Sequence, residues 1–468
     1  MKRREFIKKV GGAAVATSVV LSACDSKRSN PLITPSNVTD GQGEMTYRTN
    51  PNSGDRVSLL GYGMMRLPIE GGADLRQNPN AQVDQEMVNE EIDYALEHGV
   101  NYFDTSPVYT RGRSEGVTGT ALSRHPRKSY FIATKLSNFS PSTWTAEASK
   151  AMFENSLKEL RTDYVDYLLL HSIGGSNDTL TSMEMFNARF INNGILDWLV
   201  EQKEAGRIRN LGFSFHGDVK VFDTMLQWHD EGKYHWDFVQ IQMNYADWNY
   251  ASRIDPDNVD ANYLYEQLHS RGIPVVIMEP LLGGRLAKLP DFIVKQMKER
   301  EPESPVARWA FRFAGTPEGV LVVLSGMTYM EHLVENAATY SPLRPLSDEE
   351  IDFLTKKVAE EFVELKTVPC TACAYCMPCP YGLNIPVIFS HYNDFITEGN
   401  MPAGNPEAEE YRRNRRAFLL GYDEKVPYER QASHCIGCHQ CESHCPQKIA
   451  IAAEMQRIDE FVEHLKQS

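Results

Sequence analysis

The stretch that decides the fold is VNYFDTSPVY, residues 100–109, in which a short apolar run ends in a carboxylate. Similar apolar runs recur along the chain, and amphipathic helical stretches separate them. The runs span residues 58–61, 100–104, 130–135, 164–171, 208–214, 238–242, 274–279 and 320–325. Apolar runs that alternate with helices predict repeated β-α units around a parallel sheet.

Eight such units within the ~250 residues typical of a closed barrel predict an α/β fold, a (β/α)8 TIM barrel over residues 57–345. The alternative is a doubly wound open sheet, which is built from the same units. That fold usually carries a G-x-G-x-x-G turn after its first strand. No such turn follows the run LLGYG at residues 59–63, so we expect the barrel.

Polar residues stand at the ends of three consecutive runs. Asp104, Lys135 and His171 each close a run, and Tyr109 lies five residues after Asp104. Each has an ordinary explanation when taken alone, such as a cap, a snorkelling lysine or a satisfied core histidine. Because TIM barrels place their chemistry at the C-terminal ends of strands, the four together predict an active site.

The middle of the chain resembles the aldo-keto reductase family. The matching segments are residues 101–106 with Tyr109, 134–135, 170–171, 212–214, 239–241, and 325–326 with 335–336. The resemblance implies a catalytic tetrad of Asp104, Tyr109, Lys135 and His171, and a nicotinamide cofactor bound without a Rossmann fold. It also implies a small carbonyl or alcohol substrate.

These residue types suit the reduction of a carbonyl group, which needs a proton donor at the oxygen. Tyr109 is the expected donor, and a Lys135 ammonium would bring its high pKa closer to neutral pH. Asp104 would hold Lys135 in place. His171 would orient or polarise the substrate oxygen, where negative charge develops.

The resemblance extends to the nicotinamide site with some departures. Met278 stands where the family usually has a stacking aromatic residue, and Phe215 stands where an Asn often follows Ser214. Residues 327–332 contain no Arg or Lys, and only His332 could donate to a 2′-phosphate, so NADP and NAD both remain open. The implied contacts are Gly63, Met64, Ser214, Gln240, Met278, Ser325, Gly326, Glu335 and Asn336.

Cysteines are concentrated at the C-terminal end. Apart from Cys24, all of them follow residue 369, as C-x-x-C-x-x-C-x-x-C-P and C-x-x-C-x-x-C-x-x-x-C-P. The second run fits the bacterial ferredoxin pattern, in which the fourth cysteine binds the other cluster. We therefore predict two 4Fe-4S clusters. Their ligand sets are Cys370, Cys373, Cys376 and Cys445 for the first, and Cys435, Cys438, Cys441 and Cys379 for the second.

Zinc is the alternative for these cysteines, but it normally uses two separated pairs in one tetrahedron. Four cysteines within a short run, twice, favour iron-sulfur clusters. His434, His439 and His444 are expected to be neighbours of the clusters. The acidic stretch 346–366 predicts a connecting helix, and residues 411–420 also read as helical. The end of the chain, residues 367–468, thus resembles a helical ferredoxin-type domain.

Residues 1–23 combine a basic start, a short apolar run and a small-residue end, which is typical of an export signal. Arg3 and Arg4 resemble the twin-arginine signal of proteins exported already folded, and residues 21–24 resemble a lipoprotein box; a general secretory signal is the alternative. Clusters need reduced thiolates, which favours assembly before export. We expect a lipidated Cys24, a flexible tether over residues 24–56 and attachment to the periplasmic side of a bacterial membrane.

The net charge of −15 argues against a nucleic-acid partner, because phosphate binding requires clustered Lys and Arg. The leading functional hypothesis is an oxidoreductase with an attached iron-sulfur module and a redox protein partner. The alternative is a non-catalytic electron carrier or redox-assembly protein with a degenerate barrel. Hydride transfer moves two electrons and a cluster accepts one, and the sequence shows no flavin signature to connect them.

Overall fold

The computed structural model describes residues 43–72, 78, 80–177, 179–445 and 447–468, and these residues belong to one compact unit. The expected export signal, Cys24 and the first part of the expected tether lie outside the described residues. Within the described part of the chain, we find no helix of the length and apolarity that crossing a membrane requires.

Eight parallel strands form a closed barrel in the order β10-β3-β4-β5-β6-β7-β8-β9. Because β10 pairs with both β3 and β9, the ring has no free edge. The (β/α)8 barrel is therefore confirmed, and each predicted run lies within two residues of an observed strand. The strands are β3 (Leu60–Gly63), β4 (Tyr102–Asp104), β5 (Phe131–Leu136), β6 (Val165–Ile173), β7 (Ile208–Phe215), β8 (Phe238–Gln242), β9 (Val275–Met278) and β10 (Val320–Ser325).

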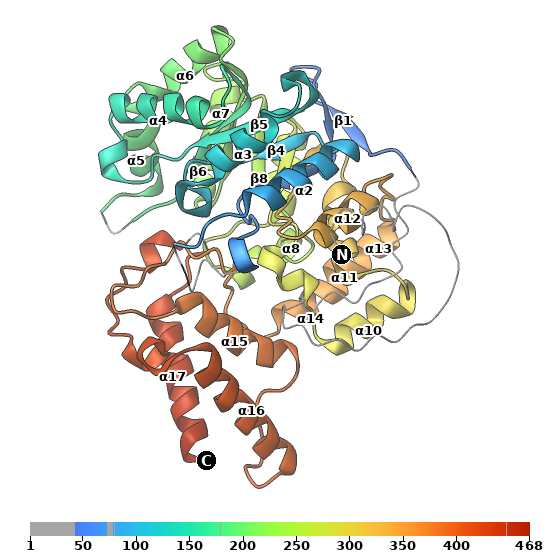
Figure 1. Ribbon diagram of the computed structural model, residues 1–468, viewed down its shortest axis with the longest axis vertical. Helices are drawn as coiled ribbons and strands as arrows, with labels where there is room; N and C mark the ends of the chain where they lie inside the picture. The colour runs from blue at the N-terminus through green and yellow to red at the C-terminus, as the bar shows by residue number, and fades with distance from the viewer. Residues whose placement is uncertain (1–42, 73–77, 79, 178, 446) are drawn as a thin grey trace. The chain divides into compact units, whose positions relative to one another are not determined.

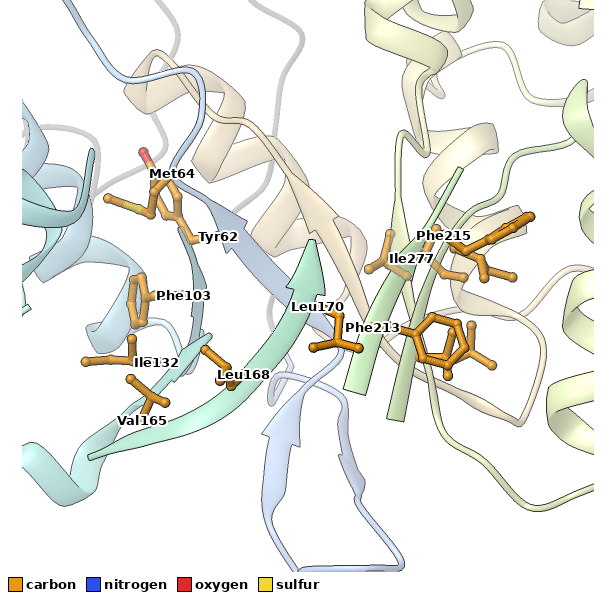
Figure 2. Packing of buried hydrophobic residues seen from close by; sticks show 14 of the residues in the cluster. Tyr62, Met64, Phe103, Ile132, Val165, Leu168, Leu170, Phe213, Phe215 and Ile277 are labelled. Carbon is orange, nitrogen blue, oxygen red and sulfur yellow. The ribbon is translucent and has the colours of Figure 1, made fainter. Parts of the chain in front are cut away.

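Alternation along the strands separates the inside of the barrel from its outer wall. Tyr167 and Leu169 pack inside the barrel with Tyr102, whereas Leu168 and Leu170 belong to the apolar layer beneath the surrounding helices (Figure 2). Successive side chains of a strand point to opposite faces. The same alternation therefore brings Asp104, Lys135 and His171 to the inner face, at the C-terminal ends of β4, β5 and β6.

Helices follow the strands around the barrel (Figure 1). Several begin at a side chain that accepts a hydrogen bond from a free N–H of the first turn, such as Asp84 before α2 and Thr145 before α4. The barrel helices are α2 (Gln85–Glu97), α3 (Ser114–Leu122), α4 (Ala146–Glu159), α5 (Ser182–Phe186), α6 (Ile195–Glu204), α7 (Val219–Asp230), α8 (Asp247–Ile254), α9 (Ala261–His269), α10 (Asp291–Arg300), α11 (Val306–Gly315) and α12 (Met330–Thr339).

A hairpin of β1 (Tyr47–Thr49) and β2 (Arg56–Ser58) precedes the barrel. Val57 packs inside the barrel, and the Asp55 carboxylate accepts hydrogen bonds from Tyr167 and Asn210. The hairpin thus closes the N-terminal end of the barrel. The predicted tether is wrong for these residues, because polar contacts that leave no hydrophobic pattern in the sequence hold them in place.

After the barrel, α13 (Asp348–Asp352), a π-helical turn (Phe353–Val358) and α14 (Ala359–Val363) run through the predicted connecting helix. The C-terminal domain contains α15 (Ile385–Thr397), α16 (Glu409–Lys425) and α17 (Ile451–Gln467) (Figure 1). Phe389, Phe418 and Met455 contribute to its separate apolar core. The predicted helical character of this domain, including residues 411–420, is confirmed.

Candidate active site and iron-sulfur sites

The four predicted catalytic residues come together inside the C-terminal end of the barrel. Lys135 Nζ donates to Asp104 Oδ1 at 2.5 Å and to the carbonyl oxygen of Thr105 at 2.9 Å. It also lies 4.7 Å from the ring centroid of Tyr109, which begins a 3₁₀ turn after β4. The Tyr109 and His171 rings meet edge to face, with centroids 5.9 Å apart.

Burial controls the protonation of this group. Burial raises the pKa of Tyr109 well above 10, and the carboxylates of Asp104 and Glu279 raise it further. Lys135 therefore does not lower the Tyr109 pKa as expected. The Asp104 carboxylate, paired with the Lys135 ammonium, offsets its positive charge. Tyr109 keeps its proton at neutral pH, which is the state that a proton donor requires.

His171 is a neutral imidazole in this environment. Burial, together with the Lys135 and Arg189 cations, holds its pKa well below 6.5. Its Nδ1 lies 2.5 Å from Ser137 Oγ and 3.4 Å from Ser106 Oγ. Sequence reasoning missed both serines, whose only signal was their position just after a strand. They leave Nε2 of His171 available to a ligand.

Three residues that directly follow predicted site residues have a backbone φ in the left-handed region. Thr110, Ser172 and Glu279 have φ values of 49°, 50° and 55°, and they directly follow Tyr109, His171 and Met278. A positive φ is unfavourable for residues with a Cβ atom, and such strain concentrates at functional sites. The strained positions therefore support an active site at this end of the barrel.

Most of the predicted nicotinamide contacts lie around the same end. By strand alternation, Ser214 and Met278 face inward near the ends of β7 and β9, and Gln240 faces inward in the middle of β8. Gln240 Nε2 has only a weak contact with Met278 Sδ at 3.4 Å, and its Oε1 is buried without a hydrogen-bond partner among the described residues. An unsatisfied carboxamide of this kind fits a polar ligand such as the nicotinamide amide group.

The other predicted contacts include residues of β3, of β10 and of the segment after β10. Asn336 Nδ2 donates to Ser325 Oγ at 3.1 Å, and a Cβ atom added at Gly63 would lie 3.2 Å from the Ser325 oxygen. Glu335 Oε1 is buried without a described partner. Gly326 packs against the Arg66 side chain.

The predicted contact Met64 lies away from the ligand region, and so does Phe215, the departure noted after Ser214. Met64 is fully buried in the apolar layer outside the strands, as is Phe215 (Figure 2). The structure therefore does not bring Met64 to the ligand side of β3. Strand alternation explains the difference, because Met64 follows inward-facing Gly63 and so points outward.

Two further charged residues at the barrel mouth were missed. Glu279 is half-buried, its carboxyl pKa is raised by loss of solvent, and the Arg66 cation partly offsets that rise. Its backbone oxygen accepts a hydrogen bond from Asn244 Nδ2 at 3.1 Å. Neither residue belongs to a sequence motif, because each lies in a loop and meets the other only in the folded chain.

The structure brings the first predicted cluster ligands together. Cys370, Cys373, Cys376 and Cys445 border one cavity, and most of its other lining residues, such as Ile385 and Phe389, are apolar. Burial raises the pKa of Cys370 to about 12, and the neighbouring thiols of Cys373 and Cys445 contribute to that rise. Four thiols around an apolar cavity are the donor set of a 4Fe-4S cluster.

Three thiols of the second predicted set, those of Cys441, Cys379 and Cys435, interact electrostatically. The pKa of the Cys441 thiol is raised to about 11 by burial and by neighbouring acidic groups that include the thiols of Cys379 and Cys435. All eight cysteines of the two runs are free of disulfides. His439 Nδ1 contacts Glu442 Oε2 at 2.9 Å.

Comparisons with protein families divide the chain in the same way. The model described as the aldo/keto reductase family matches residues 59–359, which is more than half of the chain. A model described as a 4Fe-4S dicluster domain matches residues 369–450. The two matches correspond to the barrel and to the segment that carries both cysteine runs.

Individual relatives agree with these matches. L-galactose dehydrogenase of Arabidopsis thaliana is 26% identical over 328 residues, covering 65% of this chain and 90% of that protein. D-arabinose 1-dehydrogenase of Saccharomyces cerevisiae is 35% identical over 111 residues, covering 22% and 32%. The solved aldo-keto reductase of Bacillus halodurans in its holo form shares the barrel fold, with a TM-score of 0.51 and 23% identity over 67% of this chain and 96% of that one. The chain belongs to the aldo-keto reductase family and carries a 4Fe-4S dicluster domain after its barrel.

Proposed function

We propose that the barrel interconverts a carbonyl compound and an alcohol by hydride transfer, with Tyr109 as the general acid and base. The observation that carries this proposal is the convergence of Tyr109, Lys135, Asp104 and His171 at one end of the barrel. A bound nicotinamide would supply or accept the hydride. Ser214, Gln240 and Met278 would hold its ring, and Ser325, Gly326, Glu335 and Asn336 would hold the rest of the nucleotide.

In the direction of reduction, the protonated hydroxyl of Tyr109 donates its proton to the substrate oxygen. Lys135 lies over the phenol ring and stabilises the negative charge that this transfer leaves behind. Asp104 fixes the position of Lys135. When Ser137 donates to Nδ1 of the neutral His171, the imidazole carries its proton on Nε2 and donates it in a hydrogen bond to the substrate oxygen.

Both nicotinamide nucleotides remain candidates. The region expected to meet a 2′-phosphate offers His332, whose Nδ1 is buried without a hydrogen-bond partner among the described residues. A guanidinium or ammonium group would mark NADP more clearly. The names of the two relatives suggest sugars as a first class of substrate to test.

We propose further that the C-terminal domain holds two 4Fe-4S clusters, which exchange electrons with a redox protein partner or brace the fold. Export is part of the proposal, with attachment through lipidated Cys24 to the periplasmic side of a bacterial membrane. The acidic chain is expected to bind no nucleic acid.

The function is tested with anaerobically purified, cluster-loaded protein. We expect NADPH or NADH to support reduction of 4-nitrobenzaldehyde, or NADP⁺ or NAD⁺ to support oxidation of L-galactose or D-arabinose. Tyr109→Phe should keep nucleotide binding and lose about 10²–10⁴-fold in kcat, the usual cost of removing a general acid. Tyr263→Phe, on the barrel surface, is the matched control. Unchanged turnover by Tyr109→Phe would remove Tyr109 from the mechanism.

The electron-carrier alternative is supported by one observation. Glu279 places a second carboxyl group close enough to Tyr109 to oppose formation of its phenolate. If the wild-type protein binds neither nucleotide while its clusters still accept electrons, this alternative replaces the reductase proposal.

A further inference from the structure

The first cysteine loop, residues 370–376, is attached to the mouth of the barrel. Arg66, in the loop after β3, donates from Nη2 to the backbone oxygen of Thr371 at 2.7 Å. Thr328, after β10, donates from Oγ1 to the backbone oxygen of Arg66 at 2.9 Å. The cysteine loop is thus connected to two of the loops that surround the predicted ligand region.

A glycine after β9 makes the second attachment. Gly283 has a φ of 67°, and a Cβ atom added there would lie 2.4 Å from Thr371 Cβ and 2.6 Å from Thr371 Cα. Only a glycine permits this approach of the two backbones. The next residue, Gly284, also has a positive φ of 98°, but nothing lies within 4 Å of its added Cβ atom.

Tyr375 follows Thr371 by four residues, so the attachment of Thr371 holds Tyr375 close to the active site. Its phenol lies within electrostatic range of the Tyr109 phenol, the Arg66 cation and the Glu279 carboxyl group. Tyr375 is half-buried, whereas Tyr381, a few residues further along the chain, is 46% exposed. The hydroxyl of Tyr375 has no hydrogen-bond partner in the described part of the chain, and neither has that of Tyr109.

We propose that Tyr375 is a substrate-binding residue of the barrel, supplied by the first cysteine loop and held in place through Thr371, Arg66 and Gly283. This role rests on the proposed reductase function. A phenol hydroxyl at the barrel mouth, within electrostatic range of the proton donor, suits a substrate that carries a hydroxyl group near its carbonyl carbon. The class of substrate is therefore a hydroxylated aldehyde or ketone, and the cysteine loop forms part of the wall that recognises it.

Kinetics with a matched pair of probes tests this role. Glyceraldehyde and propanal have the same carbon chain, and only glyceraldehyde has hydroxyl groups beside the carbonyl. Tyr375→Phe should raise KM for glyceraldehyde roughly three- to tenfold, the effect of losing one hydrogen bond, and leave KM for propanal and the kcat of both unchanged. Tyr381→Phe should change neither. Equal KM increases for both probes, or no increase for either, would overturn the proposal.

A photocrosslinking experiment tests, independently of turnover, whether the first cysteine loop lies against the barrel mouth. Replacement of Tyr375 with p-azidophenylalanine in the cluster-loaded protein should give a photocrosslink to peptides that contain Tyr109, Arg66 or Glu279, and the same replacement of Tyr381 should not. Crosslinks that avoid the barrel would overturn the proposal. A correct crosslink with no turnover of any probe would mean that the reductase function has failed, and the substrate role of Tyr375 with it.

A pair of glycine variants tests how the loop is held. Gly283→Ala and Gly284→Ala both strain a residue with positive φ, but only Gly283→Ala collides with Thr371. We expect Gly283→Ala to raise KM for glyceraldehyde and to weaken the photocrosslink from position 375 more than Gly284→Ala does. Equal effects of the two variants would show that Gly283 does not hold the loop in place.

Discussion

Asp104→Asn is the sharpest test of how the active site is built. The carboxylate of Asp104 and the ammonium of Lys135 are both buried, and their atoms are 2.5 Å apart. Burial alone lowers the pKa of Lys135 and raises that of Asp104, so each charge depends on the other. In this variant the carboxamide oxygen at position 104 and the Thr105 carbonyl can still accept hydrogen bonds from Lys135, but the ammonium loses its counter-charge.

The expected magnitude follows from the cost of an uncompensated buried charge. Removal of one partner from a buried ion pair costs about 3–5 kcal/mol. Since each kcal/mol shifts the melting temperature of a domain of ~150–250 residues by about 2–4 °C, the barrel should melt on the order of 10 °C lower. Lys135→Met should have a similar effect, because it leaves Asp104 unpaired.

The double variant Asp104→Asn with Lys135→Met separates stability from catalysis. It removes both charges together, and replacement of a whole buried pair by neutral groups is often close to neutral. We therefore expect its melting temperature to recover much of the loss seen in either single variant. Turnover should not recover, because the group over the Tyr109 ring is still missing.

Thermal unfolding is followed by far-UV circular dichroism under anaerobic conditions, alongside turnover of 4-nitrobenzaldehyde. Asp352→Asn is the control, because it breaks an exposed pair with Lys356 that should contribute less than about 1 kcal/mol. The reasoning is refuted if Asp104→Asn melts like this control. It is also refuted if the double variant is as unstable as the two single losses added together.

Three further predictions concern the clusters, a buried carboxyl group and export. Cys445→Ser should remove about half of the roughly eight iron atoms per chain, because this thiol borders the first cavity; full iron content would contradict the shared ligand set. Burial raises the pKa of Glu91 to about 8, so the unfolded chain releases this proton first and native stability falls as pH rises from about 5 to about 8. The melting temperature of Glu91→Gln, relative to wild type, should therefore rise progressively with pH across that range, whereas that of Glu86→Gln should not. A difference that does not change with pH would contradict a raised pKa of Glu91 as the cause. Arg3→Lys with Arg4→Lys should leave cluster-loaded protein in the cytoplasm, and normal export of this variant, followed by cell fractionation, would refute a twin-arginine signal.

The barrel was predictable because its strands carry their own signal. Buried parallel strands read as short apolar runs, and the predicted runs 238–242 and 320–325 coincide with β8 and β10. The hairpin that closes the barrel was not predictable. The hairpin is held in place by hydrogen bonds of Asp55 with Tyr167 and Asn210, which are distant from it in sequence.

The active site was predictable where a strand end places a residue, and also at Tyr109, in the loop after β4, which the family resemblance marks. Asp104, Lys135 and His171 share the inner face because strand alternation dictates it. The same rule explains why Met64, one residue beyond inward-facing Gly63, lies in the apolar layer instead. Side chains contributed by loops, such as Glu279, follow no period, so only the folded chain shows that they approach Tyr109.

The attachment of the first cysteine loop bears on how the two kinds of cofactor site are related. Thr371 stands between the predicted ligands Cys370 and Cys373, and it contacts both Arg66 and Gly283. If this loop changes its path when its predicted cluster is lost or oxidised, the change displaces Thr371, which directly follows Cys370. Through Thr371 it then reaches the barrel mouth. The second cysteine run lies in a more open loop, where Ile436 is 62% exposed. Of the two predicted clusters, the first is therefore the one whose loss we expect to affect the active site, through the position of the attached loop and without transfer of an electron to the substrate.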